Sequence, residues 1–426
     1  MDKGKKIKVF AYCDSPTCAT GFATVSRNIF EGLYRTGRYE IDVFGINYWG
    51  DPHNFPYRIW PAGTNQDRDP YGRQKAVSMI PKMEFDILFL LQDSFIMDFL
   101  PVMLPHMKDN RPAPFKSILY FPIDSIIKQK WAENINHADT LVAYSEFGKK
   151  EALKIIPDRE DMYVIPHGVS TKEFHPLPKH EAEAFRREYF KDQADKFIIT
   201  NLNRNQQRKD VPRTIQAFKE FRKQVPESIL YLHMAMKDQG WDLPEVCREM
   251  GLNITKDVIF PQNFGPNQGY PREIVNALYN ASDVIVSTTL GEGFGLSWIE
   301  AMAANVPIVM PSNTALTEFI AEDKGYLVNS GTNPSLWTII PHDNEVLRPL
   351  VDVDDMVKTL VHIYNNREEA AQKAENAYKW VTEEMDWQRN IAPQWVKLFD
   401  EAVETLKQHE ELDIEKEDKI ITTEEF

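Results

Sequence analysis

Two glutamates, Glu292 and Glu300, are separated by seven residues in the stretch STTLGEGFGLSWIEAMAANVPIVMPSN (287–313). Three glycines surround the first of them: Gly291, Gly293 and Gly295. Glycine lets the backbone approach a ligand closely, and a helix predicted from Leu296 would turn its free N–H groups toward an anion. Acidic side chains at such a turn suit a ligand with phosphate at one end and hydroxyls at the other.

The two carboxylates would then have different roles. Glu300 lies about one turn inside the predicted helix, where a carboxylate can accept both hydroxyls of a ribose. Glu292, in the turn, would reach a second hydroxylated group. Either glutamate alone is better explained as a solvated residue at a helix end. Only their combination with the glycines, the preceding strand and the following helix favours a ligand site.

A basic pair follows another predicted strand. In TNLNRNQQRKD (200–210), Arg204 and Lys209 lie five positions apart in a polar loop before a predicted helix. A forked guanidinium and a compact ammonium at strand ends suit a diphosphate. A lone pair of this kind is more often a solvated basic loop, and Arg208 is a third cation that leaves the assignment open.

Short apolar runs that alternate with helical patterns must position these residues. In the first half we predict strands at 6–12, 85–93, 116–124 and 140–145, and in the second half at 195–203, 228–236, 257–263, 282–289 and 306–312. Continuous apolar runs of this length are typical of parallel sheets covered on both faces. The alternation therefore predicts doubly wound α/β domains, with ligands at the carboxyl ends of the strands.

The chain of 426 residues is too long for one hydrophobic core and suits two domains. We predict a first Rossmann-like domain at 1–175 and a second at 176–380, with a Pro-, Gly- and His-rich linker at 164–180. A C-terminal helix at 381–406 and a frayed acidic tail at 407–426 follow.

Composition narrows the function classes. The formal net charge is −15, with 23 basic and 22 acidic residues in 1–180 but 26 against 42 in 181–426. An acidic protein is a poor non-specific binder of nucleic acid, which is disfavoured but not excluded as a partner, since the neutral first half could carry a basic patch. We expect no signal peptide, because the N-terminal segment lacks the apolar core of one. No apolar run approaches the roughly 18–20 residues of a membrane span, and the three cysteines are scattered. We expect a cytoplasmic protein; its oligomeric state is not indicated.

The second half resembles a known family. Residues 292–309 fit E-G-F-G-L-x-x-x-E-A-M-A-x-x-x-P-(I/V)-V, which is similar to the E-x7-E signature of the family-4 retaining glycosyltransferases. Further segments with matching order and spacing are TCATGFATVSRNI, ADTLVAYSEFGKK, IPHGVSTKEFHP, the Arg204/Lys209 pair and DWQRNIAPQW. The resemblance spans roughly residues 6–400 and is more specific in the second half. It implies the GT-B fold, in which two Rossmann-like doubly wound domains face a central cleft.

The resemblance also implies roles for the residues that match. Arg204 and Lys209 would bind the diphosphate of a nucleotide-diphosphate sugar, and Glu300 its ribose. Gly21 and Phe22 would approach the diphosphate from the first domain. The transferred sugar and phosphate would be held by the first glutamate and the amides of the glycine turn: Glu292, Gly293, Phe294, Gly295 and Leu296. The candidate catalytic residues are Glu292, Asp124, Arg204 and Lys209. Uridine is the commonest donor base in such families, so a UDP-sugar is the expected co-substrate.

Two positions depart from the family pattern. The family often has Gly-Gly where this chain has Gly21-Phe22, and often His-Asp where this chain has Ile123-Asp124. The sugar-contacting role of that histidine is therefore unassigned. Asp124 could orient the acceptor or the sugar, or it could cap a helix that begins just after it, and both interpretations remain open.

The candidate acceptor-binding residues lie in the first domain. The segment 47–75 is long, Pro-rich and aromatic, and Trp49 and Trp60 are its largest rings. Such a segment could stack an acceptor or could pack on itself. Asp93 and Asp124, at the ends of two predicted strands, complete the candidate acceptor site. A glycan, another hydroxyl compound or a modified nucleobase in DNA would fit.

No metal is expected in the reaction. The sequence contains DRD (67–69) and DVD (352–354), which match the paired acids that hold metals in other sugar transferases. The first lies in a loop, and the second is typical of a helix cap with acids in the first turn. We expect cationic side chains and helix dipoles to stabilise the leaving diphosphate instead.

The sequence therefore predicts a metal-independent retaining transferase that moves a sugar from a nucleotide sugar to an acceptor hydroxyl. The leaving phosphate oxygen would act as base, domain closure would assemble the site, and the last helix near Trp387–Trp395 would pack on the first domain. Two other functions remain open: a sugar-nucleotide epimerase or hydrolase of the same fold, and a non-catalytic protein that binds sugar nucleotides.

Overall fold

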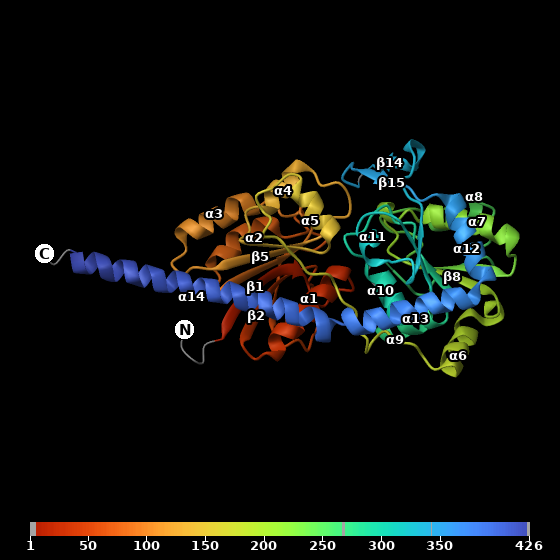
Figure 1. The fold of residues 1–426 in the computed structure, drawn as a ribbon, viewed down its shortest axis with the longest axis horizontal. Helices are drawn as coiled ribbons and strands as arrows, with labels where there is room; N and C mark the ends of the chain where they lie inside the picture. The colour runs from red at the N-terminus through yellow and green to blue at the C-terminus, as the bar shows by residue number, and fades with distance from the viewer. Residues whose placement is uncertain (1–5, 266–268, 342, 424–426) are drawn as a thin grey trace.

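The computed structural model describes residues 6–265, 269–341 and 343–423, and it contains two α/β domains side by side (Figure 1). Each domain is built around one parallel sheet, with strand order β3-β2-β1-β4-β5-β6-β7 in the first and β10-β9-β8-β11-β12-β13 in the second. In both sheets the chain starts in the middle, winds to one edge and returns to build the other half. The predicted pair of doubly wound domains is confirmed.

The strands occupy the following residues. The first sheet contains β1 (Ile7–Asp14), β2 (Tyr39–Ile46), β3 (Arg58–Pro61), β4 (Ile87–Leu91), β5 (Lys116–Phe121), β6 (Thr140–Ala143) and β7 (Tyr163–Val164). The second contains β8 (Phe197–Leu202), β9 (Ser228–His233), β10 (Val258–Ile259), β11 (Val284–Val286), β12 (Ile308–Pro311) and β13 (Tyr326–Val328). A separate antiparallel hairpin is formed by β14 (Trp337–Ile339) and β15 (Leu347–Pro349).

The helices lie between these strands and after them. Those of the first domain are α1 (Gly21–Arg35), α2 (Arg73–Met79), α3 (Leu100–Asn110), α4 (Gln129–Ile135) and α5 (Glu146–Leu153). Those that follow are α6 (Lys179–Phe190), α7 (Val211–Gln224), α8 (Leu243–Glu249), α9 (Arg272–Asn280), α10 (Leu296–Ala303), α11 (Leu316–Phe319), α12 (Val353–Asn365), α13 (Arg367–Glu384) and α14 (Ala392–Thr423). Among the helices of the described residues, none combines the length and apolar character that crossing a bilayer requires.

The central strands are buried on both faces, as their continuous apolar sequences require. In β5, Ile118 and Tyr120 enter one hydrophobic core, whereas Leu119 and Phe121 enter another on the opposite face. Successive side chains of a strand point to opposite faces, so a strand covered by helices on both sides must be apolar throughout. This burial fixes the sheet and leaves the polar strand ends at the domain interface.

The chain crosses between the domains twice, and the two crossings are bonded to each other. The Val169 N–H donates to the Met385 carbonyl (2.9 Å), and the Trp387 N–H donates to the Val169 carbonyl (3.0 Å). Helix α14 then runs along the first domain (Figure 1). Its fully buried Trp395 packs edge-on against Phe89 of β4. The last helix therefore packs back on the first domain, as the resemblance implies.

Two expectations about irregular segments need correction. The tail from 407 was predicted to be frayed, but the backbone of α14 continues as a helix to Thr423; residues 424–426 lie outside the described residues. No strand was predicted in the segment 47–75, but it contains strand β3, which pairs with β2. Neither β2 nor β3 was predicted, because charged residues interrupt their apolar patterns.

Candidate active site

The glycine turn after β11 leads into α10 at Leu296, as predicted. Gly295 precedes the helix with a φ of +87°, a conformation that favours glycine, and no side chain caps the helix start. The first backbone N–H groups of α10 are thus without a side-chain partner, and the positive end of the helix dipole lies beside them. This is the local structure that an anionic group requires.

A second helix start faces this turn from the first domain. Helix α1 begins at Gly21, after the loop 15–20 that follows β1, and the Thr20 hydroxyl accepts from the Ala23 N–H. A Cβ added to Gly21 would lie 3.7 Å from Leu296 Cδ1, so the starts of α1 and α10 meet across the interface. The structure therefore brings Gly21 and Leu296 together, whereas Phe22 packs against the hydrophobic core.

The other two glycines of the turn approach the first domain rather than open space. A Cβ on Gly291 would lie 1.9 Å from the Asp124 carbonyl oxygen, and one on Gly293 would lie 2.7 Å from Pro122 Cβ. Real Cβ atoms do not come this close to other atoms, so both positions must lack a side chain. The glycine turn thus serves the packing of the two domains as well as a ligand.

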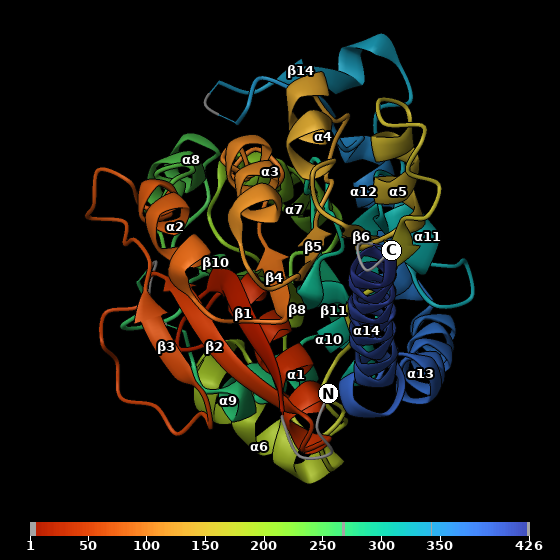
Figure 2. The same cartoon turned by 90° about the vertical axis from the view of Figure 1, so that its left-hand side faces the viewer.

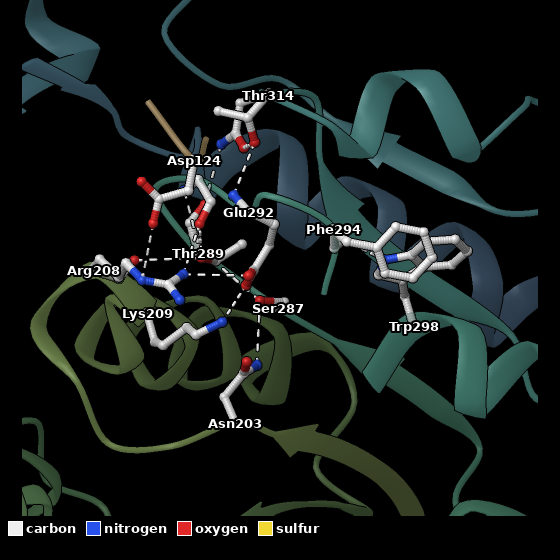
Figure 3. A network of polar contacts seen from close by, with 12 residues as sticks. Asp124, Asn203, Arg208, Lys209, Ser287, Thr289, Glu292, Phe294, Trp298 and Thr314 are labelled. Carbon is white, nitrogen blue, oxygen red and sulfur yellow. Dashed lines mark hydrogen bonds and ion pairs between the residues drawn. The ribbon is translucent and has the colours of Figure 1, made fainter. Parts of the chain in front are cut away.

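A network of charges surrounds Glu292 (Figure 3). The Glu292 carboxylate pairs with the Lys209 ammonium through a short contact, and its Oε2 lies 3.2 Å from Arg208 Nη1. The same guanidinium places its Nε 3.2 Å from Asp124 Oδ2 in the first domain. The network joins the loop before α7, the glycine turn and the strand end after β5. The Lys209–Glu292 pair therefore lies where the two domains meet.

Burial and charge act in opposite directions within this network. Burial alone would raise the pKa of Glu292, but Lys209 and Arg208 outweigh it and lower that pKa to about 2. Burial, followed by repulsion from Arg208, lowers the pKa of Lys209 to about 8 despite its bond to Glu292. Both members of the pair are charged at neutral pH, and Lys209 is close to losing its proton.

Arg204 and Arg208 occupy different surroundings. The Arg204 guanidinium binds both carboxylate oxygens of Asp238, at 2.6 Å and 3.1 Å, and is partly exposed. Arg208 instead donates to the Gly291 carbonyl (2.8 Å) and reaches the Glu292 carboxylate. Arg208 is thus the arginine that the structure places beside Lys209, which the sequence had left open.

Glu300 is buried at the interface and is held at both carboxylate oxygens. Arg272 Nη1 donates to Oε1 (3.0 Å), and the Tyr279 hydroxyl donates to Oε2 (2.9 Å). The other terminal nitrogen of Arg272 donates to the Thr24 hydroxyl of α1 (2.8 Å). A small cavity beside these groups is also lined by Leu296. The predicted ribose-binding carboxylate therefore faces the first domain at the start of α1.

Three carboxylates of the first domain end neighbouring strands of its sheet. Asp14 is the last residue of β1, Asp93 follows β4 and Asp124 follows β5. Burial, followed by the charge of Asp124, raises the pKa of Asp93 to about 7. The adjacent strands β1 and β4 form the topological switch point of the sheet, where ligands bind in such folds.

The structure decides between the two interpretations of Asp124. Helix α4 begins at Gln129 and its cap position is Lys128, so Asp124 is not a helix cap. Its carboxylate instead meets Arg208 of the second domain, and its backbone carbonyl accepts from Arg348 Nη1 (2.9 Å). The capping interpretation is wrong, and the orienting role remains.

The aromatic segment is divided between packing and exposure. Trp60 lies in β3 and packs against the hydrophobic core. The Arg58 guanidinium lies over its ring, 5.1 Å from the ring centre. Phe55 and Tyr57 stack on each other with nearly parallel rings. Trp49, in contrast, is half exposed.

Acids of the DRD and DVD motifs accept hydrogen bonds from backbone N–H groups. Asp67 Oδ2 accepts from the Thr64 N–H, and Asp69 Oδ2 accepts from the Gln74 N–H. Asp352 caps α12 by accepting from the backbone N–H groups of residues 354 and 355. Within the described ranges, no group of three or more His, Cys, Asp or Glu side chains is arranged to hold a metal ion. Metal independence of the reaction stays a prediction.

Comparison with known proteins agrees with this geometry. The family described as glycosyl transferases group 1 matches residues 182–380, which include the basic loop, the glycine turn and Glu300. The second domain belongs to this family. The resemblance found in the sequence is thereby confirmed for this group 1 glycosyltransferase domain.

Two curated relatives match the chain in part. One is a D-inositol 3-phosphate glycosyltransferase of Corynebacterium kroppenstedtii, 24% identical over 228 residues, which cover 52% of this chain and 47% of that protein. The other is a GDP-mannose-dependent alpha-(1-6)-phosphatidylinositol monomannoside mannosyltransferase of Mycolicibacterium smegmatis, 27% identical over 207 residues, 46% of this chain and 50% of that protein. The chain spans about half the length of the curated relatives it matches.

Solved structures match nearly the whole chain. Sucrose-phosphate synthase from Thermosynechococcus elongatus superposes with a TM-score of 0.71 and 18% identity, covering 94% of this chain and 100% of that one. Anabaena HepE in complex with UDP and glucose superposes with a TM-score of 0.67 and 15% identity, with the same coverage. At these identities the likeness concerns the fold. The group 1 domain and its partner domain together have the GT-B fold, as expected.

Several residues of the site had no clear signal in the sequence. Arg272 and Tyr279 hold Glu300 from α9, and Arg348 reaches Asp124 from the hairpin. These three residues lie 21 or more positions from the groups they contact. A single sequence shows periodicity and local spacing, so pairs formed by tertiary packing alone are not visible in it.

Proposed function

We propose that this protein is a retaining glycosyltransferase that moves a sugar from a nucleotide-diphosphate sugar to an acceptor hydroxyl. The observation that best supports this proposal is that the starts of α1 and α10 meet at the domain interface. The Lys209–Glu292 pair lies on one side of this meeting point and Glu300 on the other. A diphosphate matches the helix starts and the ammonium, while a ribose and a sugar match the two carboxylates. The family of the second domain supports the same reaction class.

In this proposal the donor is held mainly by the second domain. Glu300 accepts the ribose hydroxyls, Lys209 and Arg208 neutralise the diphosphate, and the first amides of α10 bind a phosphate oxygen. Arg204 contributes after its guanidinium turns from Asp238 toward the same diphosphate. Glu292 then binds hydroxyls of the transferred sugar. HepE, which has the same fold, was solved in complex with UDP and glucose, so a UDP-sugar is the first donor to test.

The proposed reaction retains the configuration at the anomeric carbon. The bond between that carbon and the diphosphate oxygen breaks, and the bonding electrons stay on the diphosphate. The acceptor oxygen bonds to the same face of the carbon and gives its proton to the departing phosphate oxygen. Lys209, Arg208 and the helix starts stabilise the charge that develops on the diphosphate. No step requires a protein base.

The acceptor is placed in the first domain. Asp93 and Asp124 present carboxylates at the strand ends that face the charge network, and Trp49 offers an exposed ring beside the sheet. Carboxylates and aromatic rings together suit a hydroxylated compound, and a glycan is the first class to test. A modified nucleobase in DNA has the same hydroxyl chemistry, although the net charge of −15 disfavours DNA.

The test is release of nucleoside diphosphate from a panel of UDP-, GDP-, ADP- and dTDP-sugars, measured without acceptor, with acceptor pools and with a chelator. Turnover of one donor that continues with the chelator and is lost in Glu300→Ala and Lys209→Ala is the expected result. Release without any dependence on acceptor would indicate a hydrolase, and rearranged sugar would indicate an epimerase. Tight binding with no turnover of any donor would contradict the proposal and indicate a binding protein.

A further inference from the structure

The hairpin β14–β15 contains a buried arginine that reaches into the other domain. The hairpin belongs to neither sheet and extends from the second domain toward α4 of the first (Figures 1 and 2). In its register Thr338 pairs with Arg348, and Trp337 and Ile339 point to the opposite face, where they are exposed. The hairpin thus turns one charged side chain toward the interface and its apolar side chains away from it.

Arg348 is only 2% exposed, although its guanidinium carries a full charge. Its Nη1 donates to the Asp124 backbone carbonyl (2.9 Å), its Nη2 lies 3.3 Å from Asp124 Oδ1, and its Nε binds the Asp343 carboxylate. A buried cation is stable only where such partners surround it. The two carboxylates and the carbonyl therefore define one position for the arginine, and the arginine defines one position for Asp124.

The contact is part of the packing between the domains. A Cβ on Gly291 would lie 3.1 Å from Arg348 Nη1 and 1.9 Å from the Asp124 carbonyl oxygen, so the guanidinium fills the space that the glycine leaves. A second contact of the same hairpin joins the Lys128 ammonium to the Asn344 carbonyl. The hairpin therefore contacts the segment 124–128 at two residues, Asp124 and Lys128. This segment follows the end of β5, where Asp124 meets the charge network.

Asp124 is held by two arginines on its two carboxylate oxygens. Arg208 contacts Oδ2 from the donor side, and Arg348 contacts Oδ1 and the backbone from the hairpin side. In the proposed function Arg208 also meets the diphosphate of the donor. Arg348 is buried and has no donor contact in that proposal, so its contacts with Asp124 can persist whether or not a donor is bound.

We propose that Arg348 is the positioning residue for Asp124, and that the hairpin β14–β15 fixes the acceptor-side segment 124–128 when the domains close. The inference rests on the proposed function, because the effect on turnover concerns the acceptor step of that reaction. It adds a residue that contacts neither donor nor sugar and acts only through Asp124. A misplacement of about 1 Å at such a group can reduce turnover about 100-fold.

The first experiment compares Arg348→Met and Arg348→Lys with the control Lys130→Met, which removes an exposed charge of α4 and should leave kcat unchanged. We expect Arg348→Met to lower kcat for transfer about 10-fold or more, with the affinity for nucleoside diphosphate changed less than about twofold. Arg348→Lys should recover part of the loss, because it restores the charge but not the fork of two donors. An equal loss of donor affinity, or an unchanged kcat, would overturn the proposal.

A double-variant cycle separates positioning from general stability. If Arg348 acts through Asp124, the losses of Arg348→Met and Asp124→Asn should combine to much less than their product. Losses that multiply in full would show that Arg348 acts elsewhere, and the proposal would fall.

Hydrogen exchange gives a readout that needs no sugar nucleotide. In Arg348→Met we expect faster exchange of the amides of 123–128, with unchanged exchange at Glu146 and Phe147, whose N–H groups are held by Glu318 at another interdomain contact. If exchange becomes faster only at 123–128 but the protein transfers no sugar, the proposed function is refuted, whereas the positioning of Asp124 by Arg348 is supported. Unchanged exchange at 123–128 would refute the positioning of this segment by Arg348.

Discussion

Tyr279 donates its hydroxyl hydrogen to Glu300 Oε2 over 2.9 Å, from α9 to α10, and both side chains are buried. Arg272 donates to the other carboxylate oxygen, so the plane of the carboxylate is fixed. Burial raises the pKa of Glu300, and Arg272 opposes this rise. A carboxylate fixed in this way is prepared to accept hydroxyls without first being ordered, which lowers the entropy cost of binding.

Glu300→Gln should weaken the binding of nucleoside diphosphate about 10- to 100-fold, because hydrogen bonds to a charged group contribute about 1.5–3 kcal/mol. Titration calorimetry measures the affinity. Tyr279→Phe is the matched control: it keeps the carboxylate, removes one orienting bond and should cost only a few-fold. Equal affinities of the wild-type protein and Glu300→Gln would show that the ribose binds elsewhere.

Lys209 should make donor binding depend on pH. Its pKa is lowered to about 8 from the ordinary 10.5, so between about pH 8 and pH 10 the buried ammonium loses a proton that a solvated lysine would keep. A diphosphate favours the charged form, so donor affinity should fall as pH rises through about 8, and binding near pH 8.5 should take up protons. Calorimetry in buffers of different ionisation enthalpy measures the uptake.

The control for this prediction is a lysine outside the site. Lys209→Met should abolish both the proton uptake and the fall in affinity, whereas Lys223→Met, on the exposed face of α7, should leave both unchanged. Proton uptake that persists in Lys209→Met would assign the titration to another group.

Asp93 should determine how the transfer rate depends on pH on the acid side of its optimum. Its pKa is raised to about 7 by burial and by the charge of Asp124, so its carboxylate form accumulates only above about pH 7. A carboxylate that orients an acceptor hydroxyl must be ionised, so the transfer rate should rise through about pH 7 and decline again as Lys209 loses its proton. Asp93→Asn should remove the rise, and Asp98→Asn, at a more exposed carboxylate, should not.

The donor half of the site was predictable because its residues are close in sequence. Glu292, Glu300 and the start of α10 lie within one strand–turn–helix unit, and such a unit has a local pattern of glycines and apolar residues. The predicted strands of both sheets were found for the same reason, since buried parallel strands are apolar throughout. Arg208 was visible but could not be separated from its neighbours without the fold.

The contacts of the site that cross between the two domains are encoded by no local pattern. Arg348 meets Asp124 across 224 positions, and Arg272 meets Thr24 across 248. The absence of a helix directly after Asp124 was equally hidden, because SIIKQKWAEN has helical spacing although α4 begins only at Gln129. In such cases tertiary packing overrides local propensity. The glycines were predicted as a ligand turn, and their contact with Pro122 and Asp124 became visible only in the structure.

Gly291 gives the sharpest test of the closed arrangement. An alanine Cβ at this position would lie 1.9 Å from the Asp124 carbonyl oxygen, a distance that backbone atoms cannot tolerate, so Gly291→Ala must move the domains apart. Because donor contacts lie mainly in the second domain, we expect nucleoside diphosphate affinity to fall only a few-fold while kcat for transfer falls about 100-fold or more. Steady-state kinetics and calorimetry separate the two effects.

The matched control for Gly291 is Gly148→Ala. A Cβ at Gly148, in α5, would meet its nearest neighbour at 3.4 Å, which is an ordinary contact, so transfer should be unchanged. If Gly291→Ala also kept its full kcat, catalysis would not need the contact between the glycine turn and Asp124. The acceptor would then bind to a more open arrangement of the domains, and Asp124 would lose its place in the reaction.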